Sequence, residues 1–118
     1  MRVNISKLQK GAGYTYHIDV RGHADGYPEV CNTMSGIMYG VIGYLANRDD
    51  VETVHKLDEN SERPEAMAEC WAQGRDEGLD AIWHFLAITI MQIEQSYPRA
   101  MALSMHIDEF PADRVLEP

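Results

Sequence analysis

Residues 14–20 read YTYHIDV, and the alternation in this stretch decides the first half of the fold. The residues that recur at every second position are Tyr14, Tyr16, Ile18 and Val20. This period of two is typical of a strand with one buried face. Residues 2–9 alternate in the same way, and the glycines within residues 10–13 favour a tight turn between the two stretches. We therefore predict a β-hairpin.

The period changes after a loop at residues 22–28, which read GHADGYP. From residue 29 to residue 46, apolar residues recur at the spacing of an amphipathic helix. They are Cys31, Met34, Met38, Val41, Ile42 and Leu45. Three glycines inside this helix (Gly36, Gly40 and Gly43) favour close backbone packing, because each costs roughly 0.5–1 kcal/mol relative to Ala.

Four further elements complete the chain. We predict strands at 51–57 and 65–73, a helix that opens at 74–77 and ends before Pro98, and a last strand at 101–107. The order ββαββαβ predicts an α/β fold of the α+β two-layer sandwich type, with a sheet of about five strands and both helices on one face. We expect one domain over residues 1–109 and a loose tail over 110–118.

One face of the predicted sheet is left without helices, and it is either exposed or covered by a partner. Five apolar residues of the strands supply enough apolar area for a dimer contact on that face. They are Tyr14, Tyr16, Met101, Leu103 and Met105.

Composition excludes several classes of protein. The 118 residues are 45% hydrophobic and 25% charged, with a net charge of −9, which indicates an ordinary globular domain. Nucleic-acid binding is not expected, because it depends on clustered Lys and Arg and the basic residues here are scattered. No signal peptide or membrane-spanning segment is evident, so we expect a cytoplasmic protein with reduced thiols and no membrane partner. The negative charge would attract a basic protein partner, although in an acidic chain such a surplus more often only keeps the protein in solution.

Cys31 and His23 are the residues best suited to chemistry. Cys31 falls in the first turn of the predicted helix, where free amides and the helix dipole stabilise a thiolate. His23 lies in the loop before it, within folding reach of the sulfur, and the amides near Cys31 and Asn32 could form an oxyanion hole. These are the parts that acyl transfer needs.

Each candidate also has a simpler interpretation. A Cys on an apolar stripe is often a core residue, and a loop His is often solvated. Cys70 alternates with alanines and is predicted to be a buried strand residue, while His17 and His106 are predicted to be solvated. A zinc site from His17, His23, Cys31 and His106 has no paired spacing to support it. We expect neither a metal nor another cofactor.

The segments Gly22-His23-Ala24 and Glu29-Val30-Cys31-Asn32-Thr33-Met34-Ser35 resemble the motif of the ribosomal-processing cysteine protease family (Prp). The similarity extends over an opening hairpin, a helix after the Cys, and a second helix before a last strand. The chain departs from the family pattern in a shorter loop between His and Cys, in Glu29 where Asp is usual, and in Asn32 and Thr33 where alanines are usual.

The resemblance implies a homodimeric thiol endopeptidase with Cys31 as nucleophile and His23 as base. Gly22, Ala24, Asn32 and Ser35 would contact the substrate, and the loop at residues 22–28 would close over it. The implied substrate is a basic large-subunit ribosomal protein precursor, which loses an N-terminal extension, or a phage structural protein. Two alternatives stay open: a catalytically silent dimeric protein-binding module of the same fold, and a redox-sensing thiol.

Overall fold

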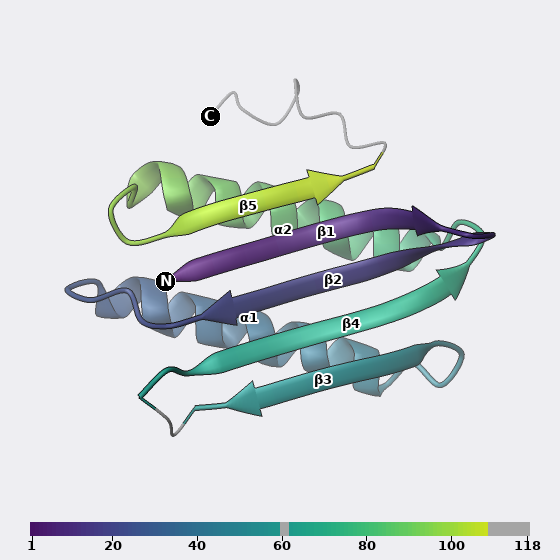
Figure 1. Cartoon of the computed structure of the whole chain (residues 1–118), viewed down its shortest axis with the longest axis horizontal. Coiled ribbons are helices and arrows are strands. Elements are labelled where there is room, and N and C mark those ends of the chain that lie inside the picture. Colours follow the sequence, from purple (N-terminus) through teal and green to yellow (C-terminus); the bar gives the residue numbers. More distant parts are fainter. Residues whose placement is uncertain (60–61, 109–118) are drawn as a thin grey trace.

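The computed structural model describes residues 1–59 and 62–108, which form one sheet and two helices (Figure 1). The elements in chain order are β1 (Arg2–Lys10), β2 (Gly13–Arg21), α1 (Pro28–Ala46), β3 (Glu52–Asp58), β4 (Glu65–Gln73), α2 (Glu77–Ser96) and β5 (Ala102–Ile107). The predicted fold class and the order ββαββαβ are therefore confirmed, and each bound differs from its predicted value by only a residue or two. The predicted tail at 110–118 lies outside the described residues.

The sheet has the strand order β3-β4-β2-β1-β5. The pairs β1–β2, β2–β4 and β3–β4 are antiparallel, whereas β1 and β5 run parallel, with Arg2 opposite Ala102. The parallel pair follows from α2, because a helical crossover carries the chain back to the starting end of the sheet before β5 begins.

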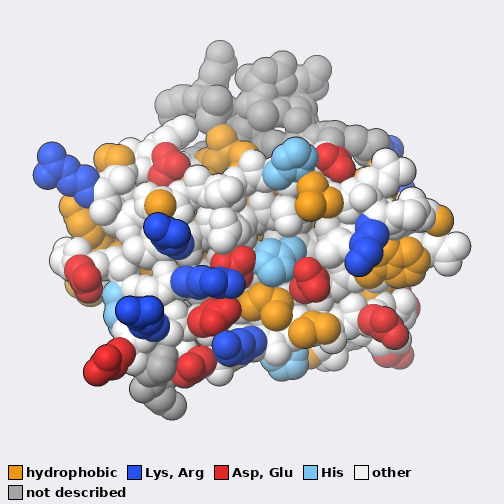
Figure 2. Space-filling model, viewed as in Figure 1, with side chains coloured by type: hydrophobic (Ala, Val, Ile, Leu, Met, Phe, Trp, Pro, Cys, Tyr) orange, Lys and Arg blue, Asp and Glu red, His pale blue; other side chains and the backbone are white. Residues whose placement is uncertain are grey.

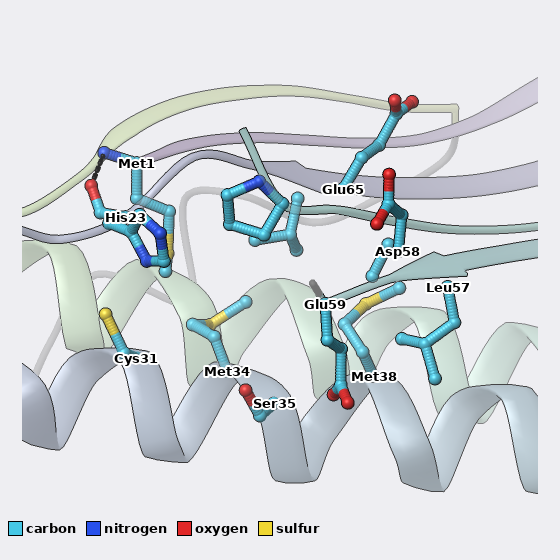
Figure 3. A pocket seen from close by; sticks show the side chains of 13 residues that line it. Met1, His23, Cys31, Met34, Ser35, Met38, Leu57, Asp58, Glu59 and Glu65 are labelled. Carbon is cyan, nitrogen blue, oxygen red and sulfur yellow. Dashed lines mark hydrogen bonds between the residues drawn. The ribbon is translucent and has the colours of Figure 1, made fainter. Parts of the chain in front are cut away.

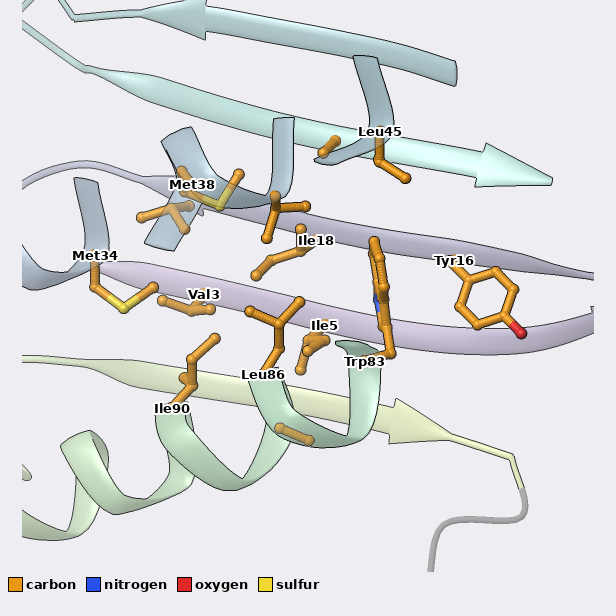
Figure 4. Close-up of a cluster of buried hydrophobic side chains, with 14 of the residues drawn as sticks. Val3, Ile5, Tyr16, Ile18, Met34, Met38, Leu45, Trp83, Leu86 and Ile90 are labelled. Carbon is orange, nitrogen blue, oxygen red and sulfur yellow. The ribbon is translucent and has the colours of Figure 1, made fainter. Parts of the chain in front are cut away.

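Both helices lie behind the same face of the sheet, and the core fills the space between the two layers (Figures 1 and 4). Trp83 of α2 is fully buried, packs edge-on against Tyr16 with 5.4 Å between ring centroids, and donates to the His17 carbonyl at 3.1 Å. Met34 and Met38 of α1 extend the core toward the other end of the sheet. Alternation along β1 and β2 thus produces the buried face that the sequence predicts.

Lys7 is the exception to this apolar face. Its side chain is 1% exposed, and its ammonium pairs with Asp80 of α2 at 2.8 Å and lies 4.7 Å from the centre of the Tyr14 ring. Asp80 also accepts a hydrogen bond from the Tyr16 hydroxyl at 2.5 Å. A buried cation is tolerated because it is paired, and the pair fixes the position of α2 on the sheet.

The open face of the sheet carries mostly polar and charged side chains (Figure 2). The expectation that Tyr14, Tyr16, Met101, Leu103 and Met105 form an apolar contact on that face is wrong. Tyr14, Tyr16, Leu103 and Met105 lie on the same side of the sheet as the buried Ile5 and Ile18, so they pack toward the helices. Met101 precedes β5 and, like Tyr16, belongs to the core. The error arose because alternation identifies two faces but not which one the helices cover.

The glycines of α1 also differ from expectation. A Cβ built on Gly36, Gly40 or Gly43 would meet no other atom within 4 Å, so close packing does not account for them. Nothing in the structure explains their presence. Neither α1 nor α2 combines the length and the hydropathy that a membrane-crossing helix requires.

Candidate active site

Cys31 lies in the first turn of α1, at the edge of the core. The helix begins with Pro28 in its first turn, where the missing N–H of proline is not needed, and with the acidic Glu29 beside it. Tyr27 caps the helix without a side-chain hydrogen bond. The Cys31 side chain is only partly buried, in contrast to its neighbour Val30, which is 1% exposed. The sulfur therefore sits at the boundary between core and solvent.

The loop before the helix folds back onto this sulfur. The Ala24 amide donates to the Cys31 Sγ at 3.3 Å, and Sγ lies 3.8 Å from the Ala24 carbonyl oxygen. Ala24 is itself 3% exposed, so this contact is part of the packed structure. An N–H donor directed at sulfur stabilises negative charge there, because hydrogen bonds to an ionised partner are stronger than neutral ones.

His23 is held at the same place by its backbone. Gly22 follows β2 with φ of +80°, a conformation that favours glycine, and its amide donates to the Pro64 carbonyl at 2.8 Å. The His23 carbonyl accepts a hydrogen bond from the Met1 amine at 2.8 Å. These contacts fix the start of the loop between β1 and the β3–β4 connection, while the imidazole itself remains exposed.

Cys31 and His23 line one cavity of about 210 Å³ between α1 and the sheet (Figure 3). They lie at the same end of it, with the sulfur rising from the helix toward the side of the ring. Among the described residues, the sulfur's hydrogen-bond partners are both atoms of Ala24, and none is an imidazole nitrogen. The cavity continues along α1 past Met34, Ser35 and Met38 to the end of β3.

The expected oxyanion hole is not formed by the helix amides. The Cys31 amide already donates to the Tyr27 carbonyl at 3.3 Å, so it does not point into the cavity. Asn32 lies one residue further into the helix, where amides bond to the preceding turn. The amide that approaches the sulfur comes instead from Ala24, in the loop.

The other predicted substrate contacts are distributed unevenly. Ser35 lines the cavity, one turn after Cys31. Gly22 and Ala24 contribute backbone amides, which donate to the Pro64 carbonyl and to the Cys31 sulfur. Asn32 is exposed and is not one of the residues that line the cavity. Its neighbour Thr33 donates to the Glu29 carbonyl at 2.8 Å and so is directed along the helix surface.

Sequence reasoning missed the far wall of the cavity. Leu57, Asp58 and Glu59 at the end of β3, together with Pro64 and Glu65 at the start of β4, lie across from α1. Their position depends on the pairing of β4 with β2, which no local pattern reveals. The helical spacing of Cys31, Ser35 and Met38 is the one signal that identified part of this surface in advance.

The remaining Cys and His residues lie elsewhere. Cys70 is 3% exposed in the core, as predicted. His17 is not simply solvated, because it lies on the open face between Asp19, at 2.6 Å, and Glu69, at 3.2 Å. His106 is exposed. The four residues considered for zinc therefore do not converge, and no group of three metal-binding side chains occurs within residues 1–59 and 62–108.

The fold, in contrast to the sequence, is similar to that of solved structures. Neither the protein-family models nor the curated protein sequences contain a match to this chain. Two crystal structures of the essential ribosomal processing protease Prp from S. aureus are similar to it. The one with a covalently linked product peptide has a TM-score of 0.62 at 16% identity, and the one with a substrate peptide has 0.60 at 17%. Both alignments cover 88% of this chain and 97% of the other.

A third similar structure is that of SMU.848 from Streptococcus mutans, with a TM-score of 0.63 at 13% identity over 92% of this chain and 100% of the other. At such identities the likeness establishes a shared fold. The expected resemblance to the ribosomal-processing protease family is thus confirmed at the level of the fold.

Proposed function

We propose that this chain is a cysteine endopeptidase in which Cys31 is the nucleophile and His23 is the general base. The observation that carries the proposal is that these two side chains line the same end of one open cavity. The shared fold with a protease crystallised with peptides supports it. A partly buried thiol beside an exposed imidazole is the pairing that thiol proteases use.

The reaction begins when an imidazole nitrogen of His23 takes the proton of the Cys31 thiol. The sulfur attacks the carbonyl carbon of a peptide bond, and the imidazolium returns the proton to the departing amine as the C–N bond breaks. Water then hydrolyses the thioester and restores the thiol. The Ala24 amide, 3.3 Å from the sulfur, supports the thiolate before the attack.

The lining of the cavity offers apolar contacts to a bound peptide. Its floor is formed by Met34 and Met38, and Leu57 closes its far end, so apolar side chains of a substrate find apolar contacts. Ser35 offers a hydroxyl on the same side of α1 as Cys31, where it can bond to the backbone of a bound chain.

The substrate that we propose is the N-terminal extension of a large-subunit ribosomal protein precursor, or a phage structural protein. The fold similarity supports a processing role, and the net charge of −9 favours a basic protein as partner. The resemblance of the motif supports a homodimer. The net charge of −9 and the scattered Lys and Arg residues favour a cytoplasmic protein that binds neither nucleic acid nor an anionic membrane surface.

The competing function is a catalytically silent protein-binding module. The observation that favours it is that the Cys31 sulfur forms its two hydrogen-bond contacts with the Ala24 backbone and not with the His23 imidazole. In that case the cavity binds a peptide and leaves it intact.

Incubation with a recombinant ribosomal precursor protein, followed by intact mass spectrometry, separates the two functions. We expect a defined N-terminal truncation by the wild-type chain, none by Cys31→Ala, and unchanged cleavage by Cys70→Ala, which removes the other thiol. Binding of the precursor without any cleavage by the wild-type chain would favour the silent module. Undiminished cleavage by Cys31→Ala would end the thiol-protease account.

A further inference from the structure

The cavity differs in character between its two ends. Cys31 and His23 stand at one end, the middle is apolar, and acidic residues stand at the other end, where β3 passes into β4 (Figure 3). A peptide whose scissile bond lies at Cys31 and whose chain follows α1 reaches this acidic end. The negative charge at this end therefore affects which peptides can bind in the cavity.

Of the three acidic residues that line this end, one is directed toward α1. The Glu59 side chain points down to the helix beside Ser35 and Met38, whereas Asp58 and Glu65 point away from the helix. Glu65 is also already paired, with Lys56 at 3.1 Å and with Arg21 at 3.6 Å. Glu59 is therefore the carboxylate available to a bound chain.

Glu59 is fixed in place but its charge is not neutralised. Its Oε1 accepts a hydrogen bond of 2.5 Å from the Tyr39 hydroxyl of α1. This bond raises the pKa of the Tyr39 phenol, because a hydrogen bond donated to a carboxylate favours the protonated hydroxyl. Within residues 1–59 and 62–108 no Lys or Arg side chain pairs with Glu59. In the part of the chain that the structure describes, its second oxygen accepts no hydrogen bond from a side chain, so a cation of the substrate can bind there.

The spacing along the helix locates this carboxylate relative to the cut. Met38 and Tyr39 follow Cys31 by seven and eight residues, which is about 10–12 Å along the axis of α1 at about 1.5 Å per residue. An extended peptide advances about 3.3 Å per residue. Glu59 thus stands about three to four residues from the scissile bond.

We propose that Glu59, held by Tyr39, is a specificity residue that accepts a Lys or Arg side chain of the substrate three to four positions from the cleaved bond. The aliphatic stem of that side chain packs on Met38 and Leu57, and its charged end reaches the carboxylate. This inference rests on the proposed function, because the cleavage site sets the register from which the position is counted.

The test is cleavage of a peptide library with randomised positions, with the products sequenced by mass spectrometry to give the residue preference at each position from the cut. For the wild-type chain we expect Lys and Arg to be enriched about three- to tenfold at a single position, about three to four residues from the cut. Glu59→Gln abolishes this enrichment, and Glu59→Lys reverses it toward Asp and Glu. Glu62→Gln, which removes the same charge from a neighbouring exposed position, leaves it intact.

Tyr39→Phe is a second variant that tests the positioning of the carboxylate. It removes only the hydroxyl, so we expect KM for the Lys-containing peptide to rise while kcat and the KM for an uncharged peptide stay constant. An enrichment of Lys or Arg that survives Glu59→Gln overturns the inference and leaves proteolysis untouched, as does cleavage without any charge preference.

If no cleavage depends on Cys31, the proposed function is wrong. The inference is then decided by binding of the same library to Cys31→Ala. Enrichment of Lys- or Arg-containing peptides that is lost in the Cys31→Ala, Glu59→Gln double variant supports the acidic subsite. Equal binding by both variants overturns it.

Discussion

The start of α1 and the middle of β4 each hold one cysteine, and the two environments are opposite. Cys31 stands partly exposed in a cavity, with a backbone amide directed at its sulfur. Cys70 stands on the helix-facing side of β4, 3% exposed, in register with Tyr16 on one side and Thr53 on the other. Burial raises the pKa of the Cys70 thiol to about 11, an effect that Arg48 partly offsets and the charges of Asp76 and Glu69 increase.

The position of a cysteine within a helix or strand decides whether its thiol can reach a substrate. A side chain in the middle of a central strand is enclosed by both neighbouring strands and the helix layer, so no peptide reaches it. A side chain in the first turn of a helix is covered only by the preceding loop, which brings its own backbone donors. Four experiments test how far the two thiols differ.

The largest expected effect is on activity. Because only Cys31 reaches the cavity, Cys31→Ala should lower kcat/KM for a cleaved peptide by at least about a thousandfold, whereas Cys70→Ala should change it by less than about twofold. Steady-state kinetics of both purified variants measure this. Equal losses in the two variants would show that the sulfurs are not functionally distinct.

The second effect is on chemical labelling. In the native protein we expect iodoacetamide to alkylate Cys31 at least about a hundredfold faster than Cys70, because Cys70 reacts only when the sheet opens. Peptide mapping by mass spectrometry over a time course assigns each rate. In urea the two rates should converge, and a difference that persisted there would not come from the fold.

The third effect is on stability at alkaline pH. Since the folded-state pKa of Cys70 is raised from 9.0 to about 11, the unfolded thiol loses its proton first as the pH rises. Its contribution to the free energy of unfolding is complete below pH 9 and declines between pH 9 and pH 11, by roughly 2–3 kcal/mol in total.

Urea unfolding at pH 8.5 and pH 10.5 measures this decline, and Cys70→Ala serves as the reference because it retains the other alkaline groups. The wild-type chain should lose more stability than the variant over this interval. An equal loss of stability in the wild-type chain and in the variant would mean that the Cys70 thiol is less enclosed than it is in the structure.

The smallest effect concerns Ser35, which shares the cavity with Cys31. Its hydroxyl is on an exposed helix position, so Ser35→Ala should raise KM by about two- to threefold and leave kcat and the labelling rate of Cys31 unchanged. Kinetics with a single peptide substrate suffice. A large fall in kcat would instead place the hydroxyl among the reacting groups.

The sequence predicted most of the fold because its periods are regular. The alternation of β1 and β2 and the helical stripes of α1 and α2 are local patterns, and the structure has them within a residue or two of the predicted bounds. The sequence placed Tyr16 on the open face of the sheet, because alternation does not tell which face the helices cover. The packing of Trp83 of α2 against Tyr16 shows that Tyr16 lies on the face covered by the helices. The burial of Lys7 was also unforeseen, because its partner Asp80 is far away in the sequence.

The candidate site was predicted only as far as local patterns extend. The positions of Cys31 at a helix start and of His23 in the preceding loop follow from neighbouring residues. Two features of the site depend on tertiary contacts such as the hydrogen bond between Gly22 and Pro64. They are the approach of the Ala24 amide, rather than a helix amide, to the sulfur, and the cavity wall that contains Glu59. Spacing in a single chain does not encode such contacts.

The parallel pairing of β1 with β5 has a consequence for how the chain folds during its synthesis. β1 is made before β5 and pairs early with β2, but its other edge stays uncovered until residues 102–107 have been made. Until then the growing chain presents an unpaired strand edge to its surroundings, which is a template for unwanted association. A chain arrested before Ala102 is therefore expected to aggregate even though every residue of the candidate site has already been made.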